Sequence, residues 1–314
     1  MRILIAGGFG YVGGRLAEYL ANAGHQIVLG TRAVISPPAW LPQAEVATLA
    51  WNDDVALRQI CEGVDLIIHA AGMNAKDCAV DPVAALAFNG LATTRLVTAA
   101  ALARVKRFVY LSTAHVYASP LIGVVTEEDC PRNLHPYAIS HLAGEQAVLS
   151  AGSRREIEGV VFRLSNAFGA PMHKDANCWM LLVADLCKQA VEARKLVLQT
   201  SGLQQIDFIG LTQVCHVIER LVAHQAEPLC YNVFNVGAGA SQSVLEMAQL
   251  IQSRCKSVLG FEPKLKRVRD GIAEQQLALT YKTENLTSLG ISCKRTDNTS
   301  EIDRLLRFCQ VAFK

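Results

Sequence analysis

The sequence predicts an α/β fold: a doubly wound parallel sheet with a smaller C-terminal lobe. Two observations carry this prediction. Short apolar runs of strand length alternate with segments of helix length through the first half of the 314 residues, which is the pattern of a parallel sheet covered by helices. The hydrophobic fraction of 51% and the charged fraction of 18% are typical of a globular chain with a large buried core.

The predicted elements follow one another regularly up to residue 166. Strands are expected at 3–6, 27–29, 45–49, 65–69, 107–111 and 160–164. Helices are expected from the end of the first turn to about residue 23, over about 82–103, and from about 137 to 149. From residue 167 the alternation becomes looser. We therefore expect a first domain over residues 1–166, whose sheet is completed by segments near 205–236, and a lobe formed mainly by residues 167–314.

Three glycines, Gly7, Gly10 and Gly13, stand between the first predicted strand and the first predicted helix. In such a strand–turn–helix unit, the backbone N–H groups and the positive end of the helix dipole face an anion. Gly7 allows the tight turn, Gly10 lets a phosphate approach the backbone, and Gly13 lets the helix pack closely on the strand. Tyr11 and Val12 complete the turn. Residues 1–166 are therefore predicted to form a Rossmann-type domain that binds the pyrophosphate of a dinucleotide.

The end of the second predicted strand bears on the choice of cofactor. It reads Gly30-Thr31-Arg32, without the acidic residue that binds the adenosine ribose in many NAD sites. The guanidinium of Arg32 suits a 2′-phosphate, which it can hold with two hydrogen bonds. A solvated surface arginine is the alternative interpretation. We therefore expect NADP(H) as the cofactor, with NAD as the alternative.

Composition argues against several other classes of protein. The formal net charge is only +2, and Lys and Arg form no run that would follow a polyanion, so we expect no nucleic-acid partner. No apolar stretch approaches the roughly 20 residues of a membrane span, so we expect no membrane segment. The ten cysteines lack the spacing of metal ligands, and most of them are expected to be buried thiols, without a metal, in a reducing cytoplasm. Met1 leads directly into the first strand, which also favours a cytoplasmic protein.

Motifs spread over nearly the whole chain carry a family resemblance. They are the glycine turn, His69-Ala70-Ala71-Gly72, Asn89-Gly90, the run from Leu111 to Tyr117, Tyr137, and the stretches 163–169 and 231–237. With these motifs the chain resembles the extended short-chain dehydrogenase/reductase superfamily, which contains nucleotide-sugar epimerases, dehydratases and reductases. The resemblance implies further cofactor contacts from Asp53, Ala70, Ala71, Asn89, Tyr137, His141 and Asn166.

The resemblance also implies a hydride-transfer site made of a Ser or Thr, a Tyr and a Lys. Thr113 matches the hydroxyl residue, with Ser112 as the neighbouring alternative, and Tyr137 matches the tyrosine. Tyr137 would move a proton to or from the substrate oxygen while hydride moves between the substrate carbon and the nicotinamide. Thr113 would hydrogen-bond to the same oxygen.

The lysine of the family, four residues after the tyrosine, is replaced by His141. Because residues i and i+4 share a helix face, His141 still points to the same neighbourhood and can donate a hydrogen bond to the nicotinamide ribose. A histidine with its usual pKa of about 6.5 is largely neutral at pH 7. Tyr137 then lacks a positive charge that would lower its pKa by about 2 units. The substitution therefore favours reduction of a ketone, or else slow or lost catalysis.

The resemblance places the substrate against the C-terminal lobe. The residues implied in substrate binding are Ser112, Thr113, Asn166, Asn177 and Arg269. Asn177 and Arg269 stand where relatives bind the diphosphate of a nucleotide sugar, although Arg269 could also be a plain surface residue. A second arginine is expected at position 206, where this chain has isoleucine. Ala114-His115 replace the Asp-Glu pair of 4,6-dehydratases, which disfavours dehydration.

We therefore predict an NAD(P)-dependent oxidoreductase or epimerase that acts on a nucleotide sugar, by 4-keto reduction or by epimerisation. One alternative is a reductase of a non-nucleotide carbonyl compound, which would suit Ile206. Another is a catalytically impaired NADP-binding module, which would suit His141. The predicted helices near 82–103 and 137–150 match those that form a four-helix dimer interface in relatives. We therefore expect a homodimer, with packing inside one subunit as the alternative.

Overall fold

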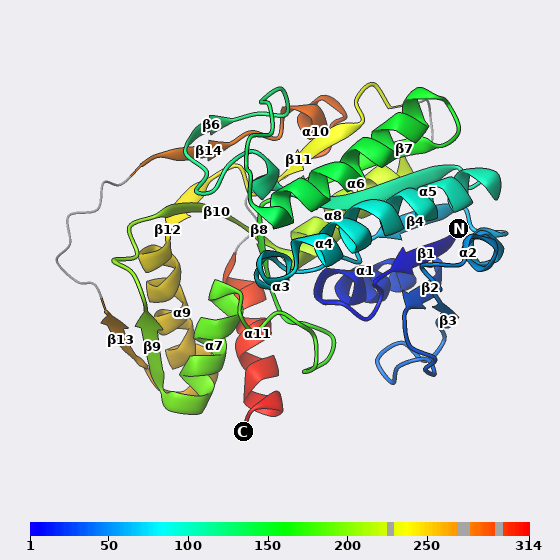
Figure 1. Ribbon diagram of the computed structural model, residues 1–314. Coiled ribbons are helices and arrows are strands. Elements are labelled where there is room, and N and C mark those ends of the chain that lie inside the picture. Colours follow the sequence, from blue (N-terminus) through cyan, green and yellow to red (C-terminus); the bar gives the residue numbers. More distant parts are fainter. Residues whose placement is uncertain (225–228, 269–276, 293–297) are drawn as a thin grey trace.

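The main element of the structure is a seven-stranded parallel sheet with the order β11-β7-β5-β4-β1-β2-β3. The computed structural model describes residues 1–224, 229–268, 277–292 and 298–314 (Figure 1). The sheet strands are β1 (Arg2–Ala6), β2 (Gln26–Thr31), β3 (Glu45–Thr48), β4 (Leu66–His69), β5 (Arg107–Thr113), β7 (Glu158–Leu164) and β11 (Val233–Val236). Every strand expected within residues 1–166 is present, and the predicted Rossmann-type fold is confirmed.

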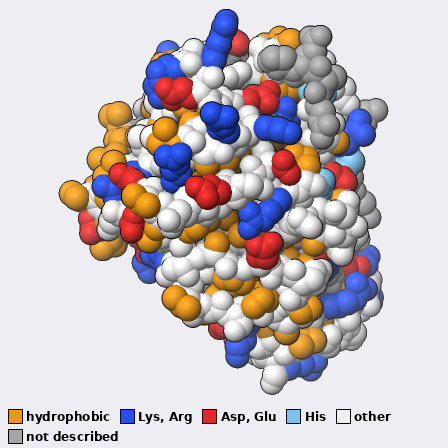
Figure 2. Space-filling view, turned by 90° about the vertical axis from the view of Figure 1, so that its right-hand side faces the viewer, with side chains coloured by type: hydrophobic (Ala, Val, Ile, Leu, Met, Phe, Trp, Pro, Cys, Tyr) orange, Lys and Arg blue, Asp and Glu red, His pale blue; other side chains and the backbone are white. Residues whose placement is uncertain are grey.

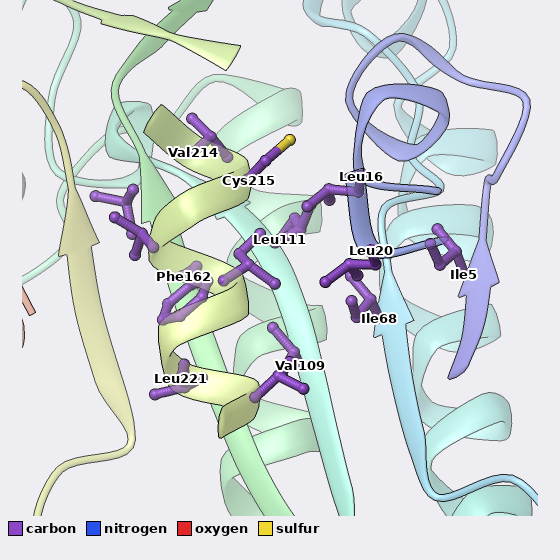
Figure 3. Close-up of a cluster of buried hydrophobic side chains, with 14 of the residues drawn as sticks. Ile5, Leu16, Leu20, Ile68, Val109, Leu111, Phe162, Val214, Cys215 and Leu221 are labelled. Carbon is purple, nitrogen blue, oxygen red and sulfur yellow. The ribbon is translucent and has the colours of Figure 1, made fainter. Parts of the chain in front are cut away.

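Each face of the sheet packs on its own set of helices. The helices are α1 (Tyr11–Asn22) and α8 (Leu211–Ala223) on one face, and α2 (Asp54–Cys61), α5 (Thr93–Leu102) and α6 (Pro136–Ser153) on the other. Alternate residues of a strand point to opposite faces, so Ile5 belongs to the first core and Leu4 to the second. Figure 3 shows Ile5 and Phe162 from the sheet, with Leu20 from α1 and Leu221 from α8.

The predicted long helix over 82–103 is one continuous helical stretch, Pro82–Leu102, with an unusual middle. It comprises α4 (Pro82–Ala85), a π-helical segment η1 (Leu86–Ala92) and α5. It has 21 residues, and 18 consecutive ones have a mean hydropathy of 1.3, so it is long and apolar enough to pass for a membrane span, and the expectation that no stretch would do so was wrong. Half of those 18 residues are buried inside the protein, as in the core helix of a globular domain.

The C-terminal lobe lies beside the sheet domain, at the left and bottom of Figure 1. Its strands are β8 (Asn166–Phe168), β10 (Gln205–Gly210) and β12 (Ser241–Ser243) in one sheet, and β9 (Lys195–Leu198) with β13 (Lys264–Arg267) in another. Its helices are α7 (Leu182–Ala193), α9 (Val244–Leu259) and α11 (Asn298–Ala312). Of the segments expected to complete the main sheet, β11 does so, whereas β10 pairs with β8 and β12.

The remaining elements are short. They are α3 (Ala75–Val80), η2 (Ala114–Val116), α10 (Glu284–Ser288), and the paired strands β6 (Gly123–Val125) and β14 (Leu279–Tyr281).

Among the described residues, nine cysteines are free thiols, and all but Cys130 and Cys230 are buried. Cys293 lies outside the described residues.

A buried cluster of polar contacts joins the two parts of the molecule. Arg15 on α1 forms an ion pair of 2.7 Å with Glu301 on α11 and also donates to the carbonyl oxygen of Ala170. Tyr11, at the start of α1, donates its hydroxyl proton to the carbonyl oxygen of Gly169. The first helix is therefore held in place from both sides, by the sheet and by the lobe.

On the face where α2 and β3 lie, acidic and basic side chains are interspersed with hydrophobic ones (Figure 2). No continuous basic stripe crosses this view, which agrees with the near-balanced charge of the sequence.

Candidate active site

A cavity of about 620 Å³ opens at the carboxyl ends of the sheet strands, between the sheet and the C-terminal lobe. It is lined by the turn after β1, the loop after β4, the last residues of β5 and β7, the first turn of α6 and the start of α7. Parallel α/β sheets bind their ligands at this edge, because the strands there diverge into loops and helix N-termini.

The glycine turn fits a dinucleotide pyrophosphate. Gly7 has φ +84°, and a Cβ there would lie 2.7 Å from the backbone nitrogen of Ala71. A Cβ on Gly13 would collide with the carbonyl oxygen of Gly7, so the close packing of α1 on β1 requires glycine. Helix α1 begins after Gly10 with no side chain capping its first N–H groups, which leaves them available to an anion. Gly10, Tyr11 and Val12 line the cavity.

The other residues predicted for the cofactor fall into two groups. Ala70 and Asn166 line the cavity, whereas Asn89 is fully buried behind it. The side chain of Asn89 accepts from the backbone N–H of Met73 at 2.8 Å and donates to the hydroxyl of Ser140 at 3.0 Å. Asn89 thus fastens the loop after β4 to helix α6.

Three further candidates, Ala71, Asp53 and Arg32, lie outside the cavity lining. The side chain of Asp53 accepts from the N–H groups of Val55 and Ala56 and caps helix α2. Arg32 follows β2, and its guanidinium lies over the ring of Phe88 at 5.5 Å. That contact holds the Arg32 side chain along the surface near the π-helical segment.

Thr113 and Tyr137 come together in the cavity, as the resemblance implies. Thr113 ends β5, and Tyr137 stands in the first turn of α6. Burial raises the pKa of Tyr137 above its usual value, and the hydrogen bond with the Thr113 hydroxyl offsets this only in part. Tyr137 therefore keeps its proton at neutral pH.

His141 lies beside Tyr137 with the two rings in a T-shaped contact at 4.5 Å. Burial lowers the pKa of His141 to about 4, so the ring is neutral at pH 7. Its Nδ1 forms a hydrogen bond of 2.9 Å with the hydroxyl of Tyr110. The positive charge that a lysine would place here is absent.

Ser112 borders the cavity, but its hydroxyl is engaged inside the protein. Its hydroxyl donates to Glu145 at 2.5 Å, and Glu145 is paired with Arg163 at 2.7 Å inside the protein. Adjacent strand residues point to opposite sides, so the Thr113 hydroxyl meets Tyr137 while that of Ser112 meets Glu145. The geometry thus favours Thr113 over Ser112 as the hydroxyl beside Tyr137.

The far end of the cavity belongs to the lobe. Asn177 and Ile206 line it, together with Met180 and Leu181 at the start of α7. Arg269, the other residue expected at the substrate, lies outside the described residues.

Sequence reasoning missed Lys76, on α3. It is the one lysine among the described residues that line the cavity, and neither Arg nor Asp nor Glu contributes to that lining. A signal for it was present, because Asn74 caps a short helix directly after the end of β4 and so brings position 76 to the ligand edge of the sheet.

Within the described ranges, no group of His, Cys, Asp and Glu side chains could hold a metal ion.

The sequence model of the NAD dependent epimerase/dehydratase family matches residues 3–237. The chain belongs to this family. The match confirms the resemblance to extended short-chain dehydrogenases/reductases, which rested on motifs within the same range. Membership also agrees with the cavity, where the glycine turn and the Thr113–Tyr137 pair share one lining.

This epimerase/dehydratase family member is similar to two curated proteins over most of its length. A dTDP-6-deoxy-L-talose 4-dehydrogenase (NAD(P)(+)) of Kitasatospora kifunensis is 29% identical over 80% of this chain and 78% of its own. An uncharacterized UDP-glucose epimerase of Bacillus subtilis is 27% identical over 84% of this chain and 86% of its own. Among solved structures, MoeE5 in complex with UDP-glucuronic acid and NAD superposes with a TM-score of 0.81 over 100% of both chains, at 22% identity.

Proposed function

We propose that this protein reduces a keto group at C4 of a nucleotide-linked sugar, with a reduced nicotinamide dinucleotide as the hydride donor. The observation that carries the proposal is the neutral His141 beside a protonated Tyr137. A tyrosine that keeps its proton is a ready acid for a ketone and a poor base for an alcohol.

The residues of the cavity supply the steps that accompany hydride transfer. The glycine turn and the start of α1 would hold the pyrophosphate, and His141 would bind the nicotinamide ribose. The bound nicotinamide would supply the hydride that adds to the carbonyl carbon. Tyr137 gives its proton to the carbonyl oxygen, and the Thr113 hydroxyl holds that oxygen in place. The product is an alcohol, and Tyr137 regains its proton from solvent.

Epimerisation is the alternative that the same residues disfavour. It requires oxidation of an alcohol before the reduction, and Tyr137 would have to accept the alcohol proton. At the ordinary tyrosine pKa of about 10, only about one side chain in a thousand is ionised at pH 7. Because burial raises the pKa of Tyr137 further, the oxidative half-reaction would be slow.

The nucleotide-sugar substrate is supported by the relatives and by the charge of the cavity. The relative from Kitasatospora acts, by its name, on a dTDP-linked deoxysugar, and MoeE5 is complexed with a UDP-sugar. Lys76 and Asn177 could bind a diphosphate in a lining to which the described part of the chain contributes no carboxylate. A reductase of a non-nucleotide carbonyl is the second candidate, favoured by the apolar side chains of Met180, Leu181 and Ile206.

NADP(H) is our preferred cofactor because Arg32 follows β2 where NAD sites often have an acid. NAD is the alternative, and MoeE5 is complexed with NAD. Thermal-shift measurements with NAD(H), NADP(H) and nucleotide sugars decide between them, since a ligand that binds the native state raises Tm.

We also propose a homodimer. Apolar side chains are exposed on the helices that the resemblance assigns to a dimer interface: Val83 (77% exposed) and Leu91 (53%) on the long helix, and Ile139 (41%) on α6. Sedimentation of the protein at micromolar concentration tests this, and a monomeric mass would refute it.

The deciding experiment for the reaction is an assay for reduction of a nucleotide-linked 4-ketohexose. The reaction is monitored as the loss of absorbance of the reduced nicotinamide. Activity with NADPH or NADH is expected, and it should disappear in Tyr137→Phe. Turnover of the 4-hydroxy sugars into their C4 epimers, faster than keto reduction, would overturn the proposal.

A further inference from the structure

Tyr110 on β5 contacts the imidazole of His141 at its Nδ1 atom. Tyr110 is fully buried, and its hydroxyl lies 2.9 Å from Nδ1 of His141. Helix α6 makes room for this hydroxyl with Gly144, since a Cβ there would lie only 2.8 Å from the Tyr110 oxygen. The contact therefore depends on a glycine at the point where α6 crosses the tyrosine.

The protons in this network can be assigned from the partners of each group. Burial raises the pKa of Tyr110 well above its usual value, so the hydroxyl keeps its proton, and the neutral ring of His141 carries one proton. Thr93 donates its own proton to the carbonyl oxygen of Asn89 at 2.7 Å, which leaves its oxygen to accept from Nε2 of His69 at 2.9 Å. The Tyr110 hydroxyl also lies within hydrogen-bonding reach of Thr93, but the Thr93 oxygen already engages His69, so the Tyr110 proton is assigned to Nδ1 of His141.

This assignment leaves the proton of His141 on Nε2. That side of the ring faces Gly72, where a Cβ would lie 3.5 Å from Nε2, and both residues line the cavity. The N–H therefore points to the place where the resemblance puts the nicotinamide ribose.

We propose that Tyr110 is a positioning residue, which fixes His141 as the Nε2–H tautomer and so presents an N–H donor to the nicotinamide ribose. The inference rests on the proposed binding of a nicotinamide dinucleotide in this cavity. A lysine has three donor protons and needs no such partner, whereas a neutral histidine has one donor on either of two nitrogens. Tyr110 removes that ambiguity.

The first test is Tyr110→Phe, which deletes the hydroxyl and keeps the ring. We expect the Kd for NAD(P)H to rise about tenfold, because without the Tyr110 hydroxyl the ring of His141 no longer holds its N–H toward the nicotinamide ribose. The Kd for ADP or 2′,5′-ADP should not change, since these fragments lack the nicotinamide ribose. Tyr281→Phe is the matched control, because Tyr281 is another buried tyrosine whose hydroxyl contacts Asn235 and the carbonyl oxygen of Arg163. It should leave both constants unchanged.

Two further measurements separate positioning from packing. In a His141→Ala background, Tyr110→Phe should have no additional effect on dinucleotide binding, because the two residues act through one contact. Nitrogen-15 NMR of labelled histidine should show His141 as the Nε2–H tautomer in the wild type and a changed tautomer ratio in Tyr110→Phe.

The outcomes decide the inference independently of turnover. Equal weakening of dinucleotide and ADP-fragment binding would show that Tyr110 only supports the fold, and an Nδ1–H tautomer in the wild type would refute the inference outright. If the protein binds no dinucleotide at all, the proposed function fails, and the inference about the ribose fails with it. A tautomer shift with normal dinucleotide binding but no keto reduction would leave the Tyr110 inference standing and refute the proposed reaction.

Discussion

Glu301, on the last helix of the chain, forms a buried ion pair with Arg15 on the first, at 2.7 Å. Thr212, at the start of α8, donates its hydroxyl proton to the same carboxylate. The helix that presents the glycine turn is thus tied to the lobe that closes the other end of the cavity.

Breaking this pair should destabilise the protein strongly. Glu301→Gln leaves the Arg15 charge buried without its partner, and we expect a loss of about 3–5 kcal/mol in the free energy of unfolding by urea. Arg304→Gln is the control, because its pair with Glu18 lies at the surface, partly exposed to solvent, and should contribute less than about 1 kcal/mol. Burial would raise the pKa of Glu301, but the hydrogen bond and charge of Arg15 lower it below its usual value. The pair's contribution is therefore complete above the unfolded-state pKa of about 4.3 and lost as pH falls through the folded-state value. Equal effects of the two variants would contradict this account.

Tyr137→Phe should abolish keto reduction while leaving dinucleotide binding within about twofold, since proton donation is worth roughly 10²–10⁴ in rate. In the wild type, the rate of reduction should be level from neutral pH up to the raised pKa of Tyr137 and fall only above it. A fall in rate between pH 7 and 9 would assign the proton to another group.

His141→Lys should raise the rate of alcohol oxidation and shift its pH profile to lower pH, because a positive charge beside Tyr137 lowers the tyrosine pKa. His216→Lys is a suitable control, since His216 is exposed on α8 and does not line the cavity. An unchanged profile in His141→Lys would show that position 141 is not electrostatically coupled to Tyr137.

Arg32→Ala should weaken NADP(H) binding by about tenfold or more and leave NAD(H) binding nearly unchanged, because a charged hydrogen bond to a phosphate is worth about 1.5–3 kcal/mol. Isothermal titration calorimetry with both cofactors measures the ratio of the Kd for NADP(H) to the Kd for NAD(H). Phe88→Leu removes the ring beneath the guanidinium and should reduce the same preference by a smaller factor. Equal losses for both cofactors would refute the role given to Arg32.

Acid should destabilise the protein through two buried neutral histidines. Burial lowers the pKa of His69 to about 3 and that of His141 to about 4. Below about pH 6.5 the unfolded chain binds these protons and the folded one does not, so stability falls with pH until the folded-state values are reached. At pH 5 we expect a loss of about 2 kcal/mol per histidine. Urea unfolding at pH 7 and 5 measures it, and His69→Gln should reduce the difference by about 2 kcal/mol.

Much of the fold was predictable because its signals are local. The strand runs, the glycine turn and Pro82 each act over a few residues, so the sheet and its helices followed from their spacing. The pairing of β10 with β8 and β12, rather than with the main sheet, depends on contacts between distant segments, which no local pattern reveals.

The candidate site likewise contains residues that the sequence predicted and partners that it did not. Thr113, Tyr137 and His141 were found from motif positions, and the structure brings them to one cavity. The partners that set their chemistry were not predictable, because Tyr110 and Gly144 read in sequence as an ordinary core residue and an ordinary helix position. Ser112 and Asn89 lie next to or within functional motifs, yet their side chains bind other parts of the protein.

The charge of the cavity lining has a consequence for the rate of turnover in salt solutions. Among the described residues, that lining has Lys76 and no carboxylate, and the ligands proposed for it carry pyrophosphate groups. Attraction over a Debye length of about 8 Å at physiological ionic strength would speed the arrival of substrate and equally slow the departure of product, which keeps its diphosphate. Raising the ionic strength should therefore increase KM, and wherever product release limits the reaction it should increase kcat as well.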